Sequence, residues 1–206
     1  MSDHVEVLGT GTASAVPDVV ALDARVQCEA DDVGSALGAA TERVTAALQA
    51  ADDHGVAASD RRTTGMGVST RWDREGRAVA GYTAHQTFRL VVRERDTVGA
   101  LITALARAAG DAFGLDGVTL EVSDRSPLLE RARTAAFADA RRTAEQYARL
   151  AGRELGPVLR VTQPRDSGGP APRLRAMAAM ESGGGMPVEP GEATVTVAVT
   201  VRFGLA

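Results

Sequence analysis

A strict alternation near the C-terminus constrains this fold more than any other feature of the sequence. Every second residue is apolar, and the intervening ones are small or polar: Val195, Val197, Val199, Val201 and Phe203 against Thr194, Thr196, Ala198, Thr200 and Arg202. Because successive side chains of a strand point to opposite faces, this period predicts a half-buried β-strand. A strand this late in the chain needs partners formed far earlier, so we expect it to pair back across the fold.

The rest of the chain alternates between strand and helix patterns. Strands are expected at His4–Ser14, Val19–Glu29, Arg62–Trp72, Ala78–Arg93, Gly117–Ser123 and Val158–Thr162. We expect the first two of these to pair through a turn at Val16-Pro17-Asp18. The third and fourth are expected to be joined by the polar turn Asp73-Arg74-Glu75-Gly76. Asp31-Asp32 and Asp96-Thr97 each precede apolar residues at helical spacing, which predicts a helix after each pair.

The longest predicted element is a helix over residues 127–151. Ser126-Pro127 is a strong helix start, because a proline at the first helical position has no amide hydrogen to leave unpaired. Its buried stripe is expected along Leu129, Ala132, Ala136, Ala140, Ala144, Tyr147 and Ala151. The alanines are small enough to let a sheet or another helix approach closely.

The order of these elements predicts an α+β fold, with mostly antiparallel sheet packed against helices. A doubly wound parallel sheet is disfavoured because the helices do not follow every strand. We expect one domain over 1–206; a division into subdomains 1–112 and 113–206, and a degenerate duplication of two halves, stay open. Residues 163–192 are rich in Gly, Pro, Ser and Met without a period, which predicts a mobile loop or arm.

The composition excludes several classes of function. The net charge of the 206 residues is −4, which disfavours binding to a nucleic acid backbone. All 23 basic residues are Arg, so P-loop chemistry and Schiff-base chemistry, which both need lysine, are excluded. No segment is apolar for long enough to span a membrane, and no signal peptide is visible, so we expect a cytoplasmic location as the chain is written and an extracytoplasmic one if a leader was removed.

Catalytic and ligand motifs are weak. Gly9-Thr10-Gly11 resembles a phosphate-binding loop, but a strand pattern follows where a helix is needed, so we interpret the glycines as a bulge or a close strand approach. His4, His54 and His85 are far apart in sequence and form no metal motif. Cys28 lies on the apolar side of its strand, typical of a small core residue. We therefore expect no catalytic, cofactor or metal site, and a protein that is not an enzyme.

Two sets of residues are candidates for contacts with other molecules. The Gly- and Pro-rich loop carries soft and cationic side chains suited to an adaptable interaction surface: Arg173, Arg175, Met177, Met180 and Met186. The long helix carries Arg131, Arg133, Arg141 and Arg142, which could bind an anion. The interpretation we favour for these four is a solvated face balanced by Glu130, Asp139 and Glu145.

An ordered set of motifs resembles the SIMPL domain family, also called DUF541. The resemblance spans nearly the whole chain: Val7-Leu8-Gly9-Thr10-Gly11, Val16-Pro17-Asp18, Gly81-Tyr82-Thr83-Ala84, Ala132-Arg133 through Ala151-Gly152, Leu155-Gly156, Val158-Leu159 and Pro187 to Glu192. It implies kinship with periplasmic or surface proteins of bacteria, among them an immunogen, a stress-linked protein and a ring-like homo-oligomer. It implies no catalytic residues.

These observations lead to two hypotheses of function. The first is a non-enzymatic SIMPL-domain protein that forms homo-oligomers and has an envelope or oxidative-stress-related role, the role resting on family resemblance. The alternative is a module that binds a small ligand or an anion through exposed arginines. No cofactor is expected under either hypothesis.

Overall fold

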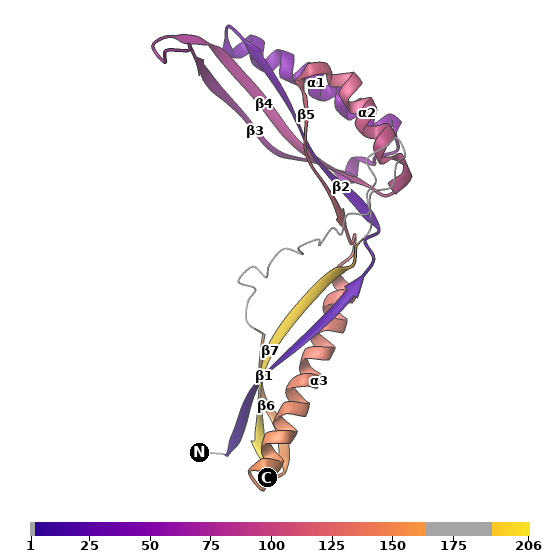
Figure 1. Cartoon of the computed structure of the whole chain (residues 1–206), viewed down its shortest axis with the longest axis vertical. Helices are drawn as coiled ribbons and strands as arrows, with labels where there is room; N and C mark the ends of the chain where they lie inside the picture. Colours follow the sequence, from indigo (N-terminus) through magenta and orange to yellow (C-terminus); the bar gives the residue numbers. More distant parts are fainter. Residues whose placement is uncertain (1–2, 164–190) are drawn as a thin grey trace. The chain divides into compact units, whose positions relative to one another are not determined.

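The computed structural model describes residues 3–163 and 191–206, which form two compact units with an α+β fold. The terminal unit contains β1 (His4–Ala15), α3 (Ser126–Leu150), β6 (Leu155–Thr162) and β7 (Ala193–Leu205). The central unit contains β2 (Val19–Ala30), α1 (Val33–Asp53), β3 (Arg61–Trp72), β4 (Val79–Val92), α2 (Val98–Ala109) and β5 (Phe113–Glu121). Figure 1 shows the elements of each unit. Both sheets are antiparallel, which confirms the predicted fold class.

The terminal sheet has the strand order β1-β7-β6. β1 pairs with β7 over its full length, from His4 opposite Gly204 to Ala15 opposite Ala193. The predicted return of the last strand to the start of the chain is therefore confirmed. The predicted pairing of the first two strands is wrong, because β1 belongs to the terminal unit and β2 to the central one. Alternation shows which side chains face a core, but it does not show which strand is the neighbour.

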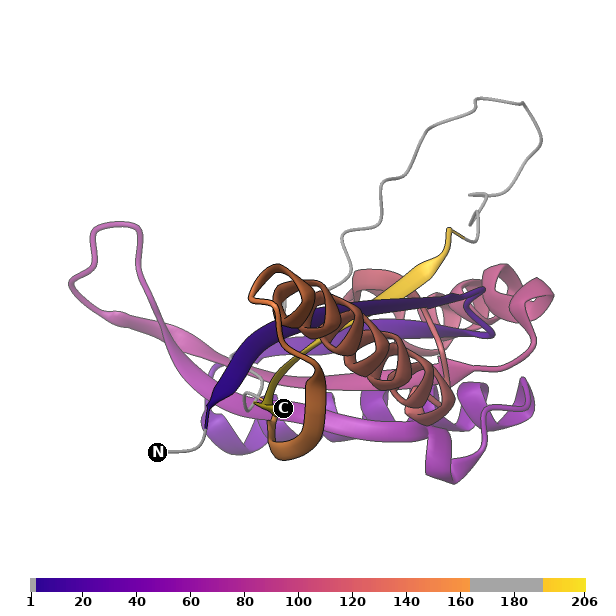
Figure 2. The ribbon, with the colours of Figure 1, turned by 90° about the horizontal axis from the view of Figure 1, so that it is seen from below.

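Helix α3 covers one face of the terminal sheet, lying along β1 and β7 (Figures 1 and 2). It begins and ends within one residue of the predicted bounds. Its buried line is Leu128, Ala132, Ala136, Ala140, Ala144 and Ala148. The prediction that Tyr147 and Ala151 belong to this line is wrong, since Tyr147 is 56% exposed and Ala151 is exposed just beyond the end of the helix. From Leu128 onward the buried residues recur at every fourth position, so Ala148 takes the place after Ala144 and Tyr147 lies beside the line.

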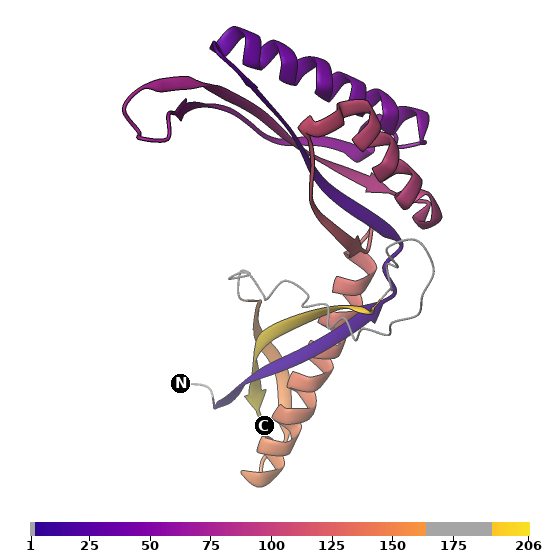
Figure 3. The ribbon, with the colours of Figure 1, turned by 45° about the horizontal axis from the view of Figure 1, so that its top comes forward.

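The central sheet has the order β3-β4-β2-β5, with α1 and α2 on one face (Figure 3). Its core is apolar, and its largest fully buried side chains are Phe88, Leu22, Leu90, Leu101 and Leu105. Asp32 begins α1 as predicted, because its Oδ1 accepts a hydrogen bond from the Ser35 amide at 2.9 Å. β3 and β4 form the predicted hairpin, whose turn is fixed by hydrogen bonds to Asp73. β5 begins at Phe113, four residues before the predicted start.

The two units share a topology. The chain order of the terminal unit is β1, α3, β6, β7. In its sheet the last of these strands, β7, lies in the middle, between β1 and β6. In the central unit β2, α1, β3 and β4 repeat this pattern as β2-β4-β3, and β5 adds a fourth strand. A duplication of one β-α-β-β element would leave this arrangement. The units do not divide at residues 112 and 113, since β1 pairs with the last strand and β5 pairs with β2.

Candidate interaction surfaces

The interaction surface expected in the Gly- and Pro-rich segment lies outside the described residues. This concerns Arg173, Arg175, Met177, Met180 and Met186, and nearly all of the loop expected over 163–192. Candidate surfaces are therefore considered in residues 3–163 and 191–206.

The titratable residues considered for catalysis or metal binding are spread over different elements. His4 lies in β1 and His85 in β4, while the Nδ1 of His54 lies 2.8 Å from the Ala50 carbonyl oxygen at the end of α1. No group of three or more His, Cys, Asp or Glu side chains suited to a metal occurs in the described part of the chain. Cys28 is half-buried against the core of the central unit, as its place in the strand pattern predicted. Burial raises the pKa of its thiol, and the positive charge of Arg43 opposes that rise.

The four arginines of α3 considered for anion binding are engaged in contacts within the terminal unit. Arg141 donates from Nε to Glu145 Oε1 at 3.0 Å, and Arg142 pairs with Asp139. Arg131 donates to the Ser14 carbonyl oxygen at 2.8 Å, and Arg133 to Gln163. Their partners include two of the carboxylates that the sequence predicted would balance this face.

An apolar strip lies on the β3–β4 hairpin. We name it the β3 strip and define it by Met66, Val68, Trp72 and Val79, which are 72%, 40%, 56% and 49% exposed. β3 pairs with β4 alone in the described structure, so its outer edge is free. The turn of the hairpin extends past the start of α1 in all three ribbon views (Figures 1, 2 and 3). Neither a helix nor a further strand of the central unit covers this edge.

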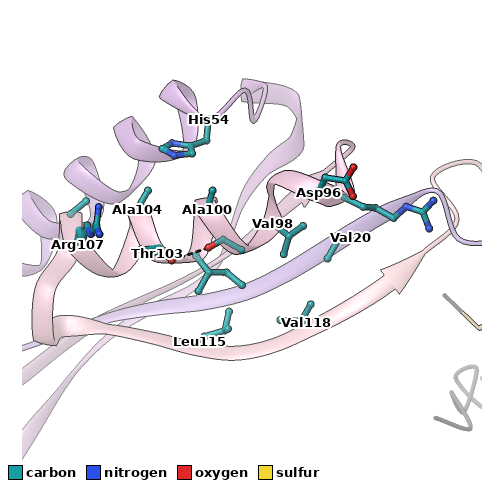
Figure 4. Close-up of a pocket in the computed structure, with 14 residues that line it drawn as sticks. Val20, His54, Asp96, Val98, Ala100, Thr103, Ala104, Arg107, Leu115 and Val118 are labelled. Carbon is teal, nitrogen blue, oxygen red and sulfur yellow. Dashed lines mark hydrogen bonds between the residues drawn. The ribbon is translucent and has the colours of Figure 1, made fainter. Parts of the chain in front are cut away.

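A hollow of about 1340 Å³ extends along the outer side of α2. Its apolar part lies between α2 and β5, and we name this part the α2–β5 groove, lined by Val20, Val98, Ile102, Leu115 and Val118. In Figure 4, Leu115 and Val118 rise from β5 toward α2. In Figure 4, Asp96 lies near the start of α2, Arg107 lies near its end beside Ala104, and His54 lies on the far side of the helix. Arg95, which precedes Asp96 in the chain, also lines the hollow.

Local sequence patterns could not have identified this groove. Its residues come from β2, α2 and β5, and each is an ordinary apolar residue of its own element. The one local signal is the pair of arginines that flank the predicted helix after Asp96-Thr97.

No helix in the described ranges is long and apolar enough to cross a membrane.

Comparison with known proteins identifies the family. Residues 5–203 match SIMPL, described as "Protein of unknown function (DUF541)". The chain is 28% identical over 178 residues to "Uncharacterized protein YggE" of Escherichia coli K12, which covers 85% of this chain and 72% of that protein. It is 26% identical over 215 residues to the "26 kDa periplasmic immunogenic protein" of Brucella melitensis, which covers 97% of this chain and 84% of that protein. The match spans both units, and this chain belongs to the SIMPL family.

Proposed function

We propose that this chain is a non-enzymatic protein of the cell envelope that forms homo-oligomers, and that copies join through the free edge of β3. The observation that carries the proposal is the β3 strip, which places exposed apolar side chains on the β3–β4 hairpin, where the outer edge of β3 has no strand partner in the described structure. The proposal assigns assembly rather than catalysis because this surface is suited to contact with another polypeptide.

A free strand edge offers a row of backbone N–H and C=O groups to any strand that can pair with it. Soluble proteins commonly protect such edges with charged residues, proline or a very short strand. β3 has 12 residues, and its middle from Gly65 to Thr70 contains neither a charge nor a proline. Antiparallel pairing of β3 with β3 of a second copy would satisfy these backbone groups and cover Met66 and Val68 in both. Such a contact is two-fold symmetric, the commonest symmetry of homo-oligomers.

Mass photometry and light scattering over a wide concentration range test this proposal. We expect the wild-type protein to be larger than a monomer and Met66→Lys to shift it toward the monomer, because a charge on the edge opposes pairing. Leu150→Lys is the matched control, since Leu150 at the end of α3 is 75% exposed and receives the same charge. A wild-type protein that is monomeric at every concentration would contradict the proposal, as would equal effects of the two substitutions.

The proposed place of action is the envelope. The Brucella relative is named a periplasmic protein, and the alignment covers 97% of this chain. Fractionation of cells that produce the complete gene product at native level should place it outside the cytoplasm. Recovery with the cytoplasmic markers would contradict this part of the proposal.

The proposed role includes protection against oxidative stress, which rests on the family resemblance. A strain without the protein should survive peroxide less well than its parent, and the wild-type gene should restore survival. Equal survival of both strains would contradict the role without bearing on assembly.

A further inference from the structure

We propose that the α2–β5 groove binds an extended acidic peptide, which adds to the free edge of β5 as a further strand. The inference is independent of self-assembly through β3, because β3 and β5 are opposite edges of the central sheet. Peptides that bind in this way gain affinity from backbone hydrogen bonds and specificity from alternate side chains.

The edge of β5 is suited to strand addition. In the described structure β5 pairs with β2 alone, so its outer backbone groups have no strand partner. A bulge at Asp116 shifts the register between Asp23 and Ala24 of β2. As a result Leu115 lies opposite Ala24 and Val118 opposite Leu22, and both side chains face the same side of the sheet. Leu115 is 38% exposed there, at the margin of the core.

Helix α2 forms the other wall of the groove. Its buried stripe of Val98, Leu101, Leu105 and Ala109 packs into the core, whereas Ile102 is half-buried and lines the groove. Gly99 and Thr103 are the neighbouring lining residues, and both are small. An incoming strand beside β5 would therefore place every second side chain between Leu115 and Val118 on one wall and Ile102 on the other.

The charges at the rim favour an acidic occupant. Arg95 and Arg107 are exposed, and neither has an ion pair within the described residues, although most arginines of the central sheet are paired. Asp96 is the one carboxylate that lines the hollow, so the rim is net positive on a chain of net charge −4. Arg95 and Arg107 thus provide charge complementarity for carboxylates at both ends of a bound segment.

The separation of these arginines predicts the pattern of the peptide. Arg95 begins a 3-10 turn, Arg95–Thr97, that leads into α2, and Arg107 lies in the last turn of α2. Three residues at a rise of about 2.0 Å and nine at about 1.5 Å separate them by roughly 20 Å. An extended strand covers this length in roughly six residues at about 3.3 Å each. Because side chains on one face recur every second residue, the expected pattern is acidic, any, apolar, any, apolar, any, acidic. The pattern reads the same in both directions and so fits either strand orientation.

The apolar walls of the groove also favour a peptide over a small anion. A small anion would contact one arginine and leave the apolar walls exposed to water, whereas a peptide strand covers both.

Fluorescence polarisation with the full chain tests the inference. The probe is a fluorescein-labelled peptide of sequence Asp-Thr-Val-Thr-Val-Thr-Asp. We expect saturable binding that the double variant Arg95→Ala/Arg107→Ala weakens by roughly tenfold or more, since it removes two charge-assisted contacts. Arg149→Ala is the matched control, because Arg149 is also an exposed helical arginine, in α3, and should leave binding unchanged.

A second peptide and a second measurement separate strand addition from simple charge attraction. Proline in place of the central threonine removes a backbone donor and should abolish binding. Hydrogen exchange should show protection of β5 amides by the first peptide and not by the second. The proposal is overturned if neither peptide binds, if both bind equally, or if inorganic phosphate displaces the peptide at comparable concentration, which would indicate an anion site only. Circular dichroism of the double variant verifies that it is folded.

Discussion

Gly9 of β1 lies so close to Ala136 of α3 that no side chain fits between the two backbones. A Cβ on Gly9 would lie 2.2 Å from the Ala136 carbonyl oxygen and 2.7 Å from the Ala140 Cβ. Gly11 repeats the relationship one turn earlier on α3, at 2.3 Å from the Ala132 carbonyl oxygen. The glycines of β1 and the alanines of α3 are therefore two sides of one contact. The glycine pattern predicted a bulge or a close strand approach; the strand is closely approached, and the element that approaches it is a helix.

Gly9→Ala should destabilise the terminal unit by about 2–3 kcal/mol, the upper part of the usual range for overpacking. The added methyl group would overlap backbone atoms of Ala136 and Ala140, which cannot move without shifting α3. The measurement is the free energy of unfolding from urea titration followed by circular dichroism.

Gly38→Ala is the control for this substitution. Gly38 is exposed in α1, and a Cβ there would meet nothing within 4 Å. Alanine is the better helix former by about 1 kcal/mol, so this variant should gain stability. Opposite signs for the two variants are the expected result; a loss at Gly38 or a gain at Gly9 would contradict the packing described here.

The ion pair of Asp60 with Arg93 predicts a dependence of stability on pH. Arg93 donates from Nε to Oδ2 at 2.8 Å and from Nη2 to Oδ1 at 2.9 Å. These hydrogen bonds hold the pKa of Asp60 below its ordinary value, against the opposing effect of burial. The unfolded chain therefore binds this proton more tightly than the folded one. The stabilisation is complete above the unfolded pKa of about 3.9 and is lost as the pH falls through the folded pKa.

Asp60→Asn tests this dependence. At neutral pH its urea midpoint should lie below that of the wild-type protein, and the difference should shrink as the pH falls below about 3.9. Asp111→Asn serves as the control, since Asp111 is exposed and has no ion pair among the described residues. A difference between Asp60→Asn and wild type that stays constant down to the lowest pH would show that the pair does not titrate as described.

Cys28 should react slowly with a thiol reagent in the native protein. Burial raises the pKa of its thiol, so little of the reactive thiolate is present at neutral pH. Arg43 favours the thiolate, and Arg43→Gln should slow the reaction further, whereas Arg74→Gln in the β3–β4 turn should not. Stopped-flow absorbance with an aromatic disulfide measures the rates. Fast and complete labelling of the native protein at neutral pH would refute the assignment of Cys28 to the margin of the core.

Surfaces were less predictable from the sequence than elements. The Ser126–Leu150 helix and the β3–β4 hairpin follow from local signals, namely Pro127, the alanine spacing and the turn at Asp73. The α2–β5 groove does not, because Leu115 and Ile102 meet only after a strand and a helix pack. Even its geometry depends on the bulge at Asp116, which turns Leu115 toward the helix side. The β3 strip does have a local sequence signal, because the stretch from Gly65 to Thr70 contains no charged residue.

The sequence by itself determined the local properties of the chain through the spacing of its apolar and small residues. This spacing shows which segments are strands or helices, which of their faces are apolar, and where small residues permit close contact. These properties depend on neighbours two to four residues apart. The tertiary structure decided which strands are neighbours: it paired β1 with β7, separated β1 from β2, and left the edges of β3 and β5 free. Pairing depends on contacts between distant segments, such as Gly9 against Ala136, and no local pattern carries that information.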